Sequence, residues 1–125
     1  IVLCPNSISQ EAAIGALLCS SSEIDKLKEI FKRRRETLWE EMEKLRGISC
    51  VKPTGGLYAF PNISSFGLAD NDFVKYLARE AGVLTLPGTE FGKFGEGHIR
   101  LSLCTSEENI REGIRRINEA VRVLF

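Results

Sequence analysis

A long amphipathic segment is the feature that most constrains the fold of this chain. Between residues 23 and 46 the apolar side chains recur at the spacing of one narrow α-helical face: Ile24, Leu27, Phe31, Leu38, Met42 and Leu45. Ser22 is placed to cap this helix and Gly47 to terminate it. The helix would be ~36 Å long at 1.5 Å per residue. Because that length is large for a small domain, we expect the helix to connect two parts of the protein.

The segment after this helix predicts a small, mostly antiparallel sheet. Residues 48–51 and 57–60 have strand character and flank a Pro- and Gly-containing turn, so we expect them to pair as a hairpin. Residues 83–86 predict a further short strand. Residues 98–104 alternate with period two, with one face made of Ile99, Leu101 and Leu103 and the other of Arg100 and Ser102.

Three further helices are expected. The first ends near residues 20–22, which are the best linker candidate, the second closes at Gly82, and the third carries an apolar stripe made of Ile110, Ile114, Ile117, Val121 and Leu124. Their predicted N-caps are, in chain order, Ser7 with Gln10, Asp70 or Asn71, and Thr105 with Glu108. The chain is therefore predicted to be α+β, a small sheet covered by helices with a long N-terminal linking helix.

Charge and hydropathy exclude several classes of function. The 125 residues include 17 basic and 17 acidic side chains, so there is no net positive charge to attract nucleic acid. The one basic run, residues 32–35, lies among glutamates and is interpreted as a salt-bridged helix face. No apolar run approaches the ~20 residues that a membrane-spanning helix needs. We therefore expect neither nucleic acid nor a membrane as a partner.

The ends and the cysteines give further expectations. Residues 1–5 are apolar but too short for a signal peptide, and the chain begins with Ile1 rather than methionine, so we expect a fragment of a longer protein. No cysteines form a C-x-x-C pair and the only histidine is His98, so no metal site is predicted. We expect small, buried cysteines in a reducing, cytoplasmic compartment at Cys4, Cys19, Cys50 and Cys104.

Arg100 is the most informative single residue. Placed in a strand directly after a glycine-rich segment, it could present its guanidinium to a carboxylate through two parallel hydrogen bonds. A solvated arginine on the open face of a sheet is the alternative, and these residues alone leave both open. Residues 87–97 do not match a phosphate-binding loop, because only three residues separate Gly88 from Gly92 and Phe94 follows Lys93. The chain also lacks a self-contained catalytic constellation.

Three motifs in order carry a resemblance to a known family. They are Pro53-Thr-Gly55-Gly56-Leu-Tyr58-Ala-Phe60-Pro, Gly82-Val-Leu-Thr-Leu-Pro87-Gly88-Thr-Glu-Phe91-Gly92, and Gly97-His-Ile-Arg100-Leu-Ser102. With the long charged helix, they resemble the C-terminal part of the class I/II aminotransferases, the aspartate-aminotransferase-like pyridoxal-phosphate enzymes of fold type I. The resemblance covers essentially the whole chain.

The resemblance implies a domain organisation for the chain. Residues 1–22 would be the tail end of the large cofactor-binding domain, residues 23–125 the small domain, and residues 23–46 the helix between them. The full-length protein would be a homodimer that uses pyridoxal 5'-phosphate. It would transfer an amino group between an amino acid, aspartate or similar, and a 2-oxo acid.

The resemblance also assigns site residues. Arg100 would bind the α-carboxylate of the substrate. The residues that would border the cleft and move with domain closure are Gly55, Gly56, Tyr58, Pro87, Gly88, Phe91 and Gly92. Neither a catalytic residue nor a cofactor-binding residue is assigned, because none of the lysines stands in the sequence context that this family uses for the Schiff base.

The missing lysine sets what the chain can do alone. We expect no cofactor bound to it and no turnover without the N-terminal large domain. Two alternatives remain open. One is a non-catalytic binding or dimerisation module derived from the same fold. The other is a different fold type I reaction, that of a decarboxylase, lyase or synthase, because a fold does not determine a reaction.

Overall fold

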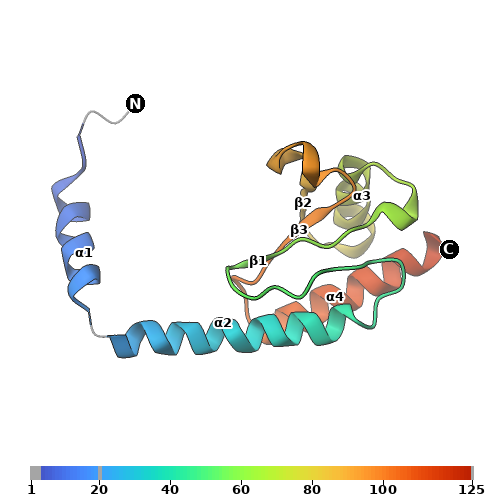
Figure 1. Ribbon diagram of the computed structural model, residues 1–125. Helices are drawn as coiled ribbons and strands as arrows, with labels where there is room; N and C mark the ends of the chain where they lie inside the picture. Colours follow the sequence, from blue (N-terminus) through green and yellow to red (C-terminus); the bar gives the residue numbers. More distant parts are fainter. Residues whose placement is uncertain (1–3, 20, 125) are drawn as a thin grey trace. The chain divides into compact units, whose positions relative to one another are not determined.

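A computed structural model describes residues 4–19 and 21–124 of the 125-residue chain (Figure 1). Within it the chain forms two compact units, Ile1–Ile30 and Phe31–Phe125. The division falls inside α2, the helix Ser21–Met42. The predicted domain boundary at residues 22 and 23 stays a prediction. None of the described helices is long and apolar enough to cross a membrane.

The first unit consists of α1, Ser7–Leu18, and the first part of α2. The N-cap of α1 is Asn6 rather than the predicted Ser7. Its side-chain oxygen accepts hydrogen bonds from the backbone N–H groups of Ile8 at 2.8 Å and Ser9 at 3.3 Å. Asn is among the strongest N-caps, so the helix starts at Ser7, one residue earlier than the Ser-x-x-Gln spacing suggested. Of the linker candidate, Ser20 lies outside the described residues.

The start of α2 also differs from the prediction. Ser21 is its first residue, so Ser22 lies inside the helix instead of capping it. The predicted apolar face divides into two parts. Leu38 and Met42 are buried in the second unit, whereas Ile24 and Leu27 in the first unit are 46% and 56% exposed. Only the second half of this stripe therefore contributes to a core.

The second unit contains a three-stranded antiparallel sheet in the order β1-β3-β2 (Figure 1). The central strand is β3, Ile99–Ser102, flanked by β1, Tyr58–Ala59, and β2, Leu86–Pro87. Tyr58 pairs with Ser102 and Leu86 with Arg100. This sheet with its helices confirms the α+β prediction. The predicted period-two face is confirmed as well, because Ile99 and Leu103 are fully buried.

The predicted hairpin between residues 48–51 and 57–60 is wrong. Ser49 makes only an isolated bridge to Asn62, and β1 pairs with β3 instead. The backbone N–H groups of Leu103 and Ile99 donate to the carbonyl oxygens of Leu57 and Pro61, at 2.8 and 3.0 Å. β3 buries two apolar side chains, Ile99 and Leu101, so pairing with it places β1 on the core. A local hairpin offers no comparable burial.

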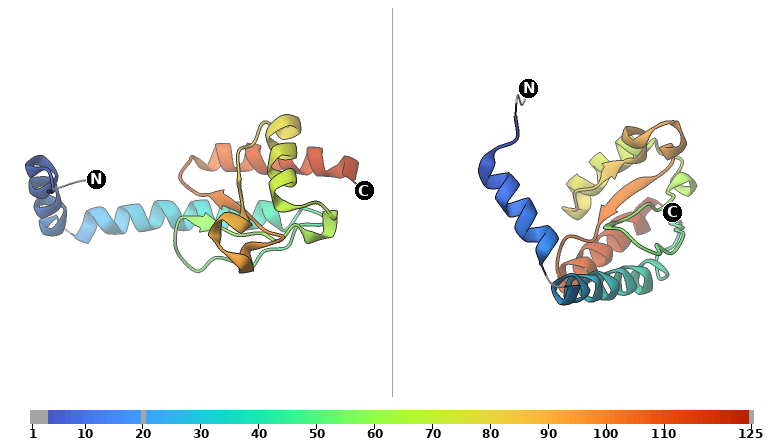
Figure 2. Two further views of the ribbon diagram at one scale, coloured as in Figure 1. Left: turned by 90° about the horizontal axis from the view of Figure 1, so that it is seen from above. Right: turned by 60° about the vertical axis from the view of Figure 1, so that its left-hand side comes forward.

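Two helices complete the second unit. α3, Asp70–Tyr76, continues as a π-helical turn, Leu77–Ala81, and ends at Gly82, which has a positive φ of 63°. α4, Glu107–Val121, is followed by a 3₁₀ turn, Arg122–Leu124. Figure 2 shows α4 alongside the C-terminal half of α2, where Thr37 Oγ1 donates to Glu107 Oε2 at 3.2 Å. The Tyr76 hydroxyl donates to the Ala120 carbonyl at 2.7 Å, which joins α3 to α4.

The helix caps of this unit are shifted by one residue from their predicted places. Ala69 occupies the N-cap of α3, so Asp70 is the first helical residue. Its carboxylate accepts a hydrogen bond from the backbone N–H of Thr89, in another segment. The N-cap of α4 is Ser106, whose hydroxyl accepts from the Asn109 N–H at 3.2 Å. The predicted apolar stripe of α4 is confirmed. Its members are buried except Leu124, which is half-buried.

The cysteines are not the buried residues that were predicted. Cys4, Cys19 and Cys104 are exposed, and Cys50 is half-buried. Cys19 follows the last residue of α1, and Cys104 lies two residues after the end of β3, so neither stands on a core face. Burial raises the pKa of the Cys50 thiol above its ordinary value, although a hydrogen bond from the Phe60 backbone opposes this shift.

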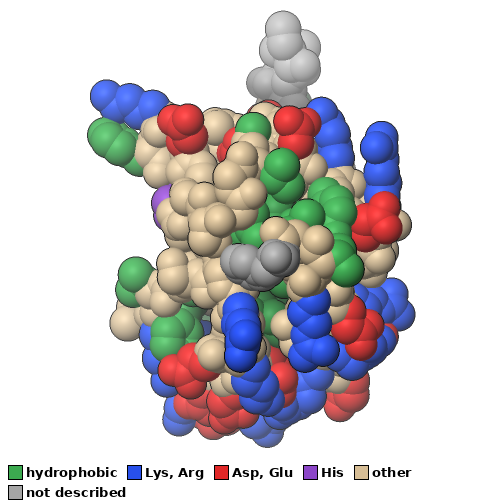
Figure 3. All heavy atoms as spheres, turned by 90° about the vertical axis from the view of Figure 1, so that its right-hand side faces the viewer, with side chains coloured by type: hydrophobic (Ala, Val, Ile, Leu, Met, Phe, Trp, Pro, Cys, Tyr) green, Lys and Arg blue, Asp and Glu red, His purple; other side chains and the backbone are tan. Residues whose placement is uncertain are grey.

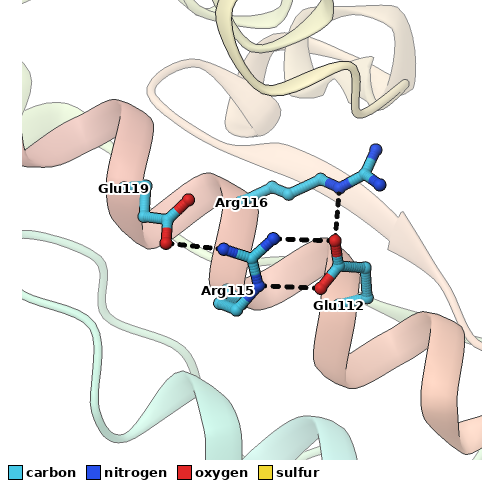
Figure 4. Close-up of polar contacts among 4 residues, drawn as sticks. All are labelled: Glu112, Arg115, Arg116 and Glu119. Carbon is cyan, nitrogen blue, oxygen red and sulfur yellow. Dashed lines mark hydrogen bonds and ion pairs between the residues drawn. The ribbon is translucent and has the colours of Figure 1, made fainter.

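Charged side chains of both signs share the surface. On the face shown in Figure 3, Lys and Arg lie beside Asp and Glu over its lower part. On α4, Figure 4 shows Glu112 paired with both Arg115 and Arg116, with Arg115 also pairing with Glu119. Such mixing agrees with the interpretation of the charged helices as solvated, salt-bridged faces.

Candidate functional site

Arg100 stands on the face of β3 opposite the core. Its neighbours Ile99 and Leu101 are buried, whereas Arg100 itself is half-buried. Tyr58 pairs with Ser102, two residues along β3 from Arg100, so Tyr58 and Arg100 are diagonal neighbours on one face of the sheet. The strand period therefore brings a cationic side chain and an aromatic ring together outside the core.

Two aromatic rings contact the guanidinium of Arg100. Its central carbon lies 4.2 Å from the ring centroid of Tyr58 and 4.6 Å from that of Phe91. Both distances lie within the range of cation–π attraction. Phe91 ends a 3₁₀ turn, Gly88–Phe91, that directly follows β2. The site therefore combines one residue from β1, one from β3 and one from the 3₁₀ turn after β2.

A second layer of rings supports Phe91. The ring of Phe60 meets Phe91 edge-on, with centroids 6.0 Å apart and an interplanar angle of 87°. His98 stacks on Phe60 at 5.2 Å and 9°. The imidazole is held in turn, with Nδ1 2.9 Å from the carbonyl oxygen of Glu96 and Nε2 3.3 Å from the side-chain nitrogen of Asn62. This contact set gives His98 a packing role.

The glycine-rich segment folds back on itself through a close backbone contact. A Cβ on Gly88 would lie 2.0 Å from the carbonyl oxygen of Gly95, so glycine is required at this crossing. The Gly88 N–H also donates to the His98 carbonyl at 2.8 Å. Residues 87–97 contain two 3₁₀ turns, the second being Lys93–Gly95, and this folded backbone carries Phe91 to Arg100.

A buried carboxylate anchors the same segment. Asp70, only 4% exposed, accepts hydrogen bonds from the backbone N–H of Thr89 at 2.8 Å and of Asn71 at 3.1 Å. Burial alone would raise the pKa of Asp70, but the hydrogen bonds from Thr89 and Asn71 outweigh it and hold the pKa below its ordinary value. Asp70 therefore stays ionised at neutral pH.

The structure brings together only some of the predicted site residues. Arg100, Tyr58 and Phe91 are in contact, and Pro87 and Gly88 are buried at the start of the folded segment. Open space surrounds the Cβ positions of the three other glycines, Gly55, Gly56 and Gly92. Sequence reasoning missed the support that Phe60 gives Phe91, although Tyr58 and Phe60 are spaced to share one face of a strand.

The guanidinium of Arg100 has no acidic partner within the part of the chain that the structure describes. Aromatic rings attract the cation but supply no carboxylate or carbonyl acceptor for its five N–H donors. A planar carboxylate accepts two of these donors in parallel. The site is therefore suited to hold a small carboxylate ligand in a fixed orientation.

Comparisons with known proteins agree on one family. Residues 2–117 match the family model for aminotransferase class I and II. The chain is 38% identical over 116 residues, 93% of its length, to a probable N-acetyl-LL-diaminopimelate aminotransferase of Bacillus subtilis strain 168. It is 36% identical over 117 residues, 92% of its length, to an aspartate aminotransferase of Pyrococcus horikoshii.

A solved structure shares the fold. The crystal structure of an aromatic aminotransferase from Pyrococcus horikoshii matches 98% of this chain with a TM-score of 0.89 and 33% sequence identity. The chain covers 34% of that structure, and 29% and 30% of the two relatives, so it spans about a third of the length of the proteins it matches. By family model, by sequence and by fold, the chain belongs to the class I and II aminotransferases.

Proposed function

We propose that this chain is the C-terminal segment of a pyridoxal-phosphate-dependent aminotransferase. The full-length protein transfers an amino group between an amino acid, aspartate or similar, and a 2-oxo acid. In this proposal residues 1–22 belong to the large domain and residues 23–125 form the small domain. The whole protein is a homodimer, as the family resemblance implies, and it is cytoplasmic.

One observation carries the role proposed for this segment. Arg100 stands outside the core, between elements that fix its position, and its guanidinium has aromatic neighbours but no acidic partner in the described residues. A buried or half-buried arginine normally pairs with a carboxylate. We therefore assign the missing partner to the substrate, whose α-carboxylate Arg100 binds through two parallel hydrogen bonds.

The lysines of this chain do not fit the cofactor's covalent site. When bound, pyridoxal phosphate supplies an electron sink for the amino-acid substrate and is held by a lysine amine. Such a lysine is normally activated by desolvation or by a neighbouring cation. All seven lysines here are exposed: Lys26, Lys28, Lys32, Lys44, Lys52, Lys75 and Lys93. This supports a cofactor lysine in the remainder of the full-length protein and an inactive isolated segment.

Substitution of Arg100 in the full-length enzyme tests this function. Arg100→Lys keeps the charge and removes the two-pronged donor geometry, so we expect KM for the amino-acid and 2-oxo-acid substrates to rise by roughly tenfold or more. Steady-state kinetics with a panel of substrates measures it. Arg79→Lys, an exposed arginine in the turn after α3, is the matched control and should leave KM unchanged.

The outcomes separate the proposal from its alternatives. An unchanged KM for every substrate in the Arg100→Lys enzyme would contradict the carboxylate role. A full-length protein without transamination, but with another reaction on amino acids, would favour a decarboxylase, lyase or synthase. A folded full-length protein with no activity and no bound cofactor would favour a binding or dimerisation module.

A further inference from the structure

The orientation of Arg100 depends on aromatic residues outside its own strand. An arginine side chain has many rotamers, and its five donors are useful to a planar ligand only when the guanidinium is held still. Here the fixing contacts are rings, at 4.2 Å for Tyr58 and 4.6 Å for Phe91, rather than an acid. Rings hold the cation without neutralising it, so the charge remains available to a ligand.

Phe91 is the less obvious of the two rings, because it comes from the glycine-rich segment and not from the sheet. Its ring is fixed from behind by Phe60, which in turn stacks on His98. The Gly88–Gly95 backbone crossing and the Asp70–Thr89 hydrogen bond fix the turn that carries it. Phe91 itself is 48% exposed, so its ring is not held in place by burial in the core. The contacts that fix it therefore indicate that its position beside Arg100 matters.

We propose that Phe91, together with Tyr58, is a positioning residue that holds the guanidinium of Arg100 ready for the substrate carboxylate. This inference rests on the proposed function. It predicts that substrate affinity depends on the ring at position 91, although that ring supplies no hydrogen bond to the ligand. It also predicts that the effect of the ring acts through Arg100.

The test compares Phe91→Leu with Phe91→Tyr in the full-length enzyme. Leucine is apolar but has no π face, so we expect KM for the 2-oxo acid to rise about five- to tenfold while kcat changes less than twofold. Tyrosine restores the ring and should stay within about twofold of wild type. The Kd of a non-reacting dicarboxylate, measured by calorimetry, should follow KM, and the thermal midpoint should stay unchanged.

Phe94→Leu is the matched control on the same segment. Phe94 lies three residues further on, is 87% exposed and contacts the Lys93 side chain rather than Arg100. The Phe94→Leu variant should leave KM and Kd unchanged. Tyr58→Leu and Tyr58→Phe form a second pair, with the same loss and rescue expected. This pair decides the question if Phe91→Leu does not fold.

Coupling to Arg100 distinguishes positioning from general damage. In an Arg100→Lys background, Phe91→Leu should raise Kd by less than twofold, because the geometry it protects is already lost. If Phe91→Leu leaves Kd unchanged while Arg100→Lys raises it, the inference fails and the proposed function stands. If Arg100→Lys itself leaves Kd unchanged, both fail. An equal loss in Phe94→Leu would also overturn the inference.

Discussion

The backbone N–H of Thr89 donates a hydrogen bond to the buried carboxylate of Asp70 across 2.8 Å. This contact joins the first turn of α3 to the first turn of the 3₁₀ segment Gly88–Phe91. Asp70 was predicted as a possible cap of its own helix, and it instead holds a second segment. The carboxylate thus links the packing of α3 to the position of Phe91 beside Arg100.

Asp70→Asn should lower the free energy of unfolding by roughly 1–3 kcal/mol at pH 7, because an amide is a weaker acceptor than the buried carboxylate for the N–H groups of Thr89 and Asn71. Since the folded state lowers the pKa of Asp70, the contribution is present above its ordinary value of 3.8 and is lost as pH falls through the folded pKa. Urea unfolding of both proteins from pH 7 to pH 3 measures the difference, which should shrink at the acidic end.

Asp72→Asn provides the control for this prediction. Asp72 is on the same helix, but its carboxylate is exposed and pairs with Lys75 at 3.5 Å. Exposed pairs of this kind contribute about 0–1 kcal/mol. Equal losses for the two variants, or a loss in Asp70→Asn that does not change with pH, would contradict the assigned role of Asp70.

Local patterns predicted those parts of the fold that depend on neighbouring residues. The alternation of Ile99, Leu101 and Leu103 and the stripe of α4 were both correct, because burial on one face leaves a period in the sequence. The caps moved by one residue, since Asn6 and Ser106 are as competent as the Ser7 and Thr105 beside them. Such neighbours cannot be ranked by spacing alone.

The parts that failed depend on contacts between distant segments. The hairpin was wrong because β1 gains more burial against β3, about forty residues away, than against residues 48–51. Arg100 was singled out from its place in the strand, and Tyr58 and Phe91 were named from the family resemblance. Nothing in their local sequence shows that two rings meet one guanidinium. Cys104 is similarly exposed because β3 ends at Ser102, before it, and local sequence does not show where the strand ends.

Gly88→Ala should destabilise the second unit by at least about 1–3 kcal/mol, which is typical when an added methyl group is forced into a packed site. A Cβ at position 88 would stand 2.0 Å from the Gly95 carbonyl oxygen, so one backbone would have to move. Chemical denaturation measures the change. Because the crossing also positions Phe91, the variant should lose substrate affinity in the full-length enzyme as well.

Gly113→Ala is the opposite case and the control. Gly113 lies inside α4 with nothing within 4 Å of its Cβ position. Alanine there removes backbone freedom from the unfolded chain and should stabilise the protein by about 0.4–1 kcal/mol. A stability loss at Gly113, or none at Gly88, would contradict the packing described for these glycines.

Glu112 on the outer face of α4 should titrate far below an ordinary glutamate. Its oxygens accept from Arg115 Nε at 2.7 Å and Nη2 at 2.8 Å, and from Arg116 Nε at 2.7 Å (Figure 4). These hydrogen bonds, Arg115 first, lower the pKa of Glu112 to about 2. Its contribution to stability is therefore present above pH 4.5 and is lost as pH falls toward 2.

An NMR titration of the Glu112 side chain measures this pKa directly. Because the group is exposed, about 1 M salt should move the value back toward 4.5. A pKa near 4.5 at low salt would show that the arginines do not hold this carboxylate in solution.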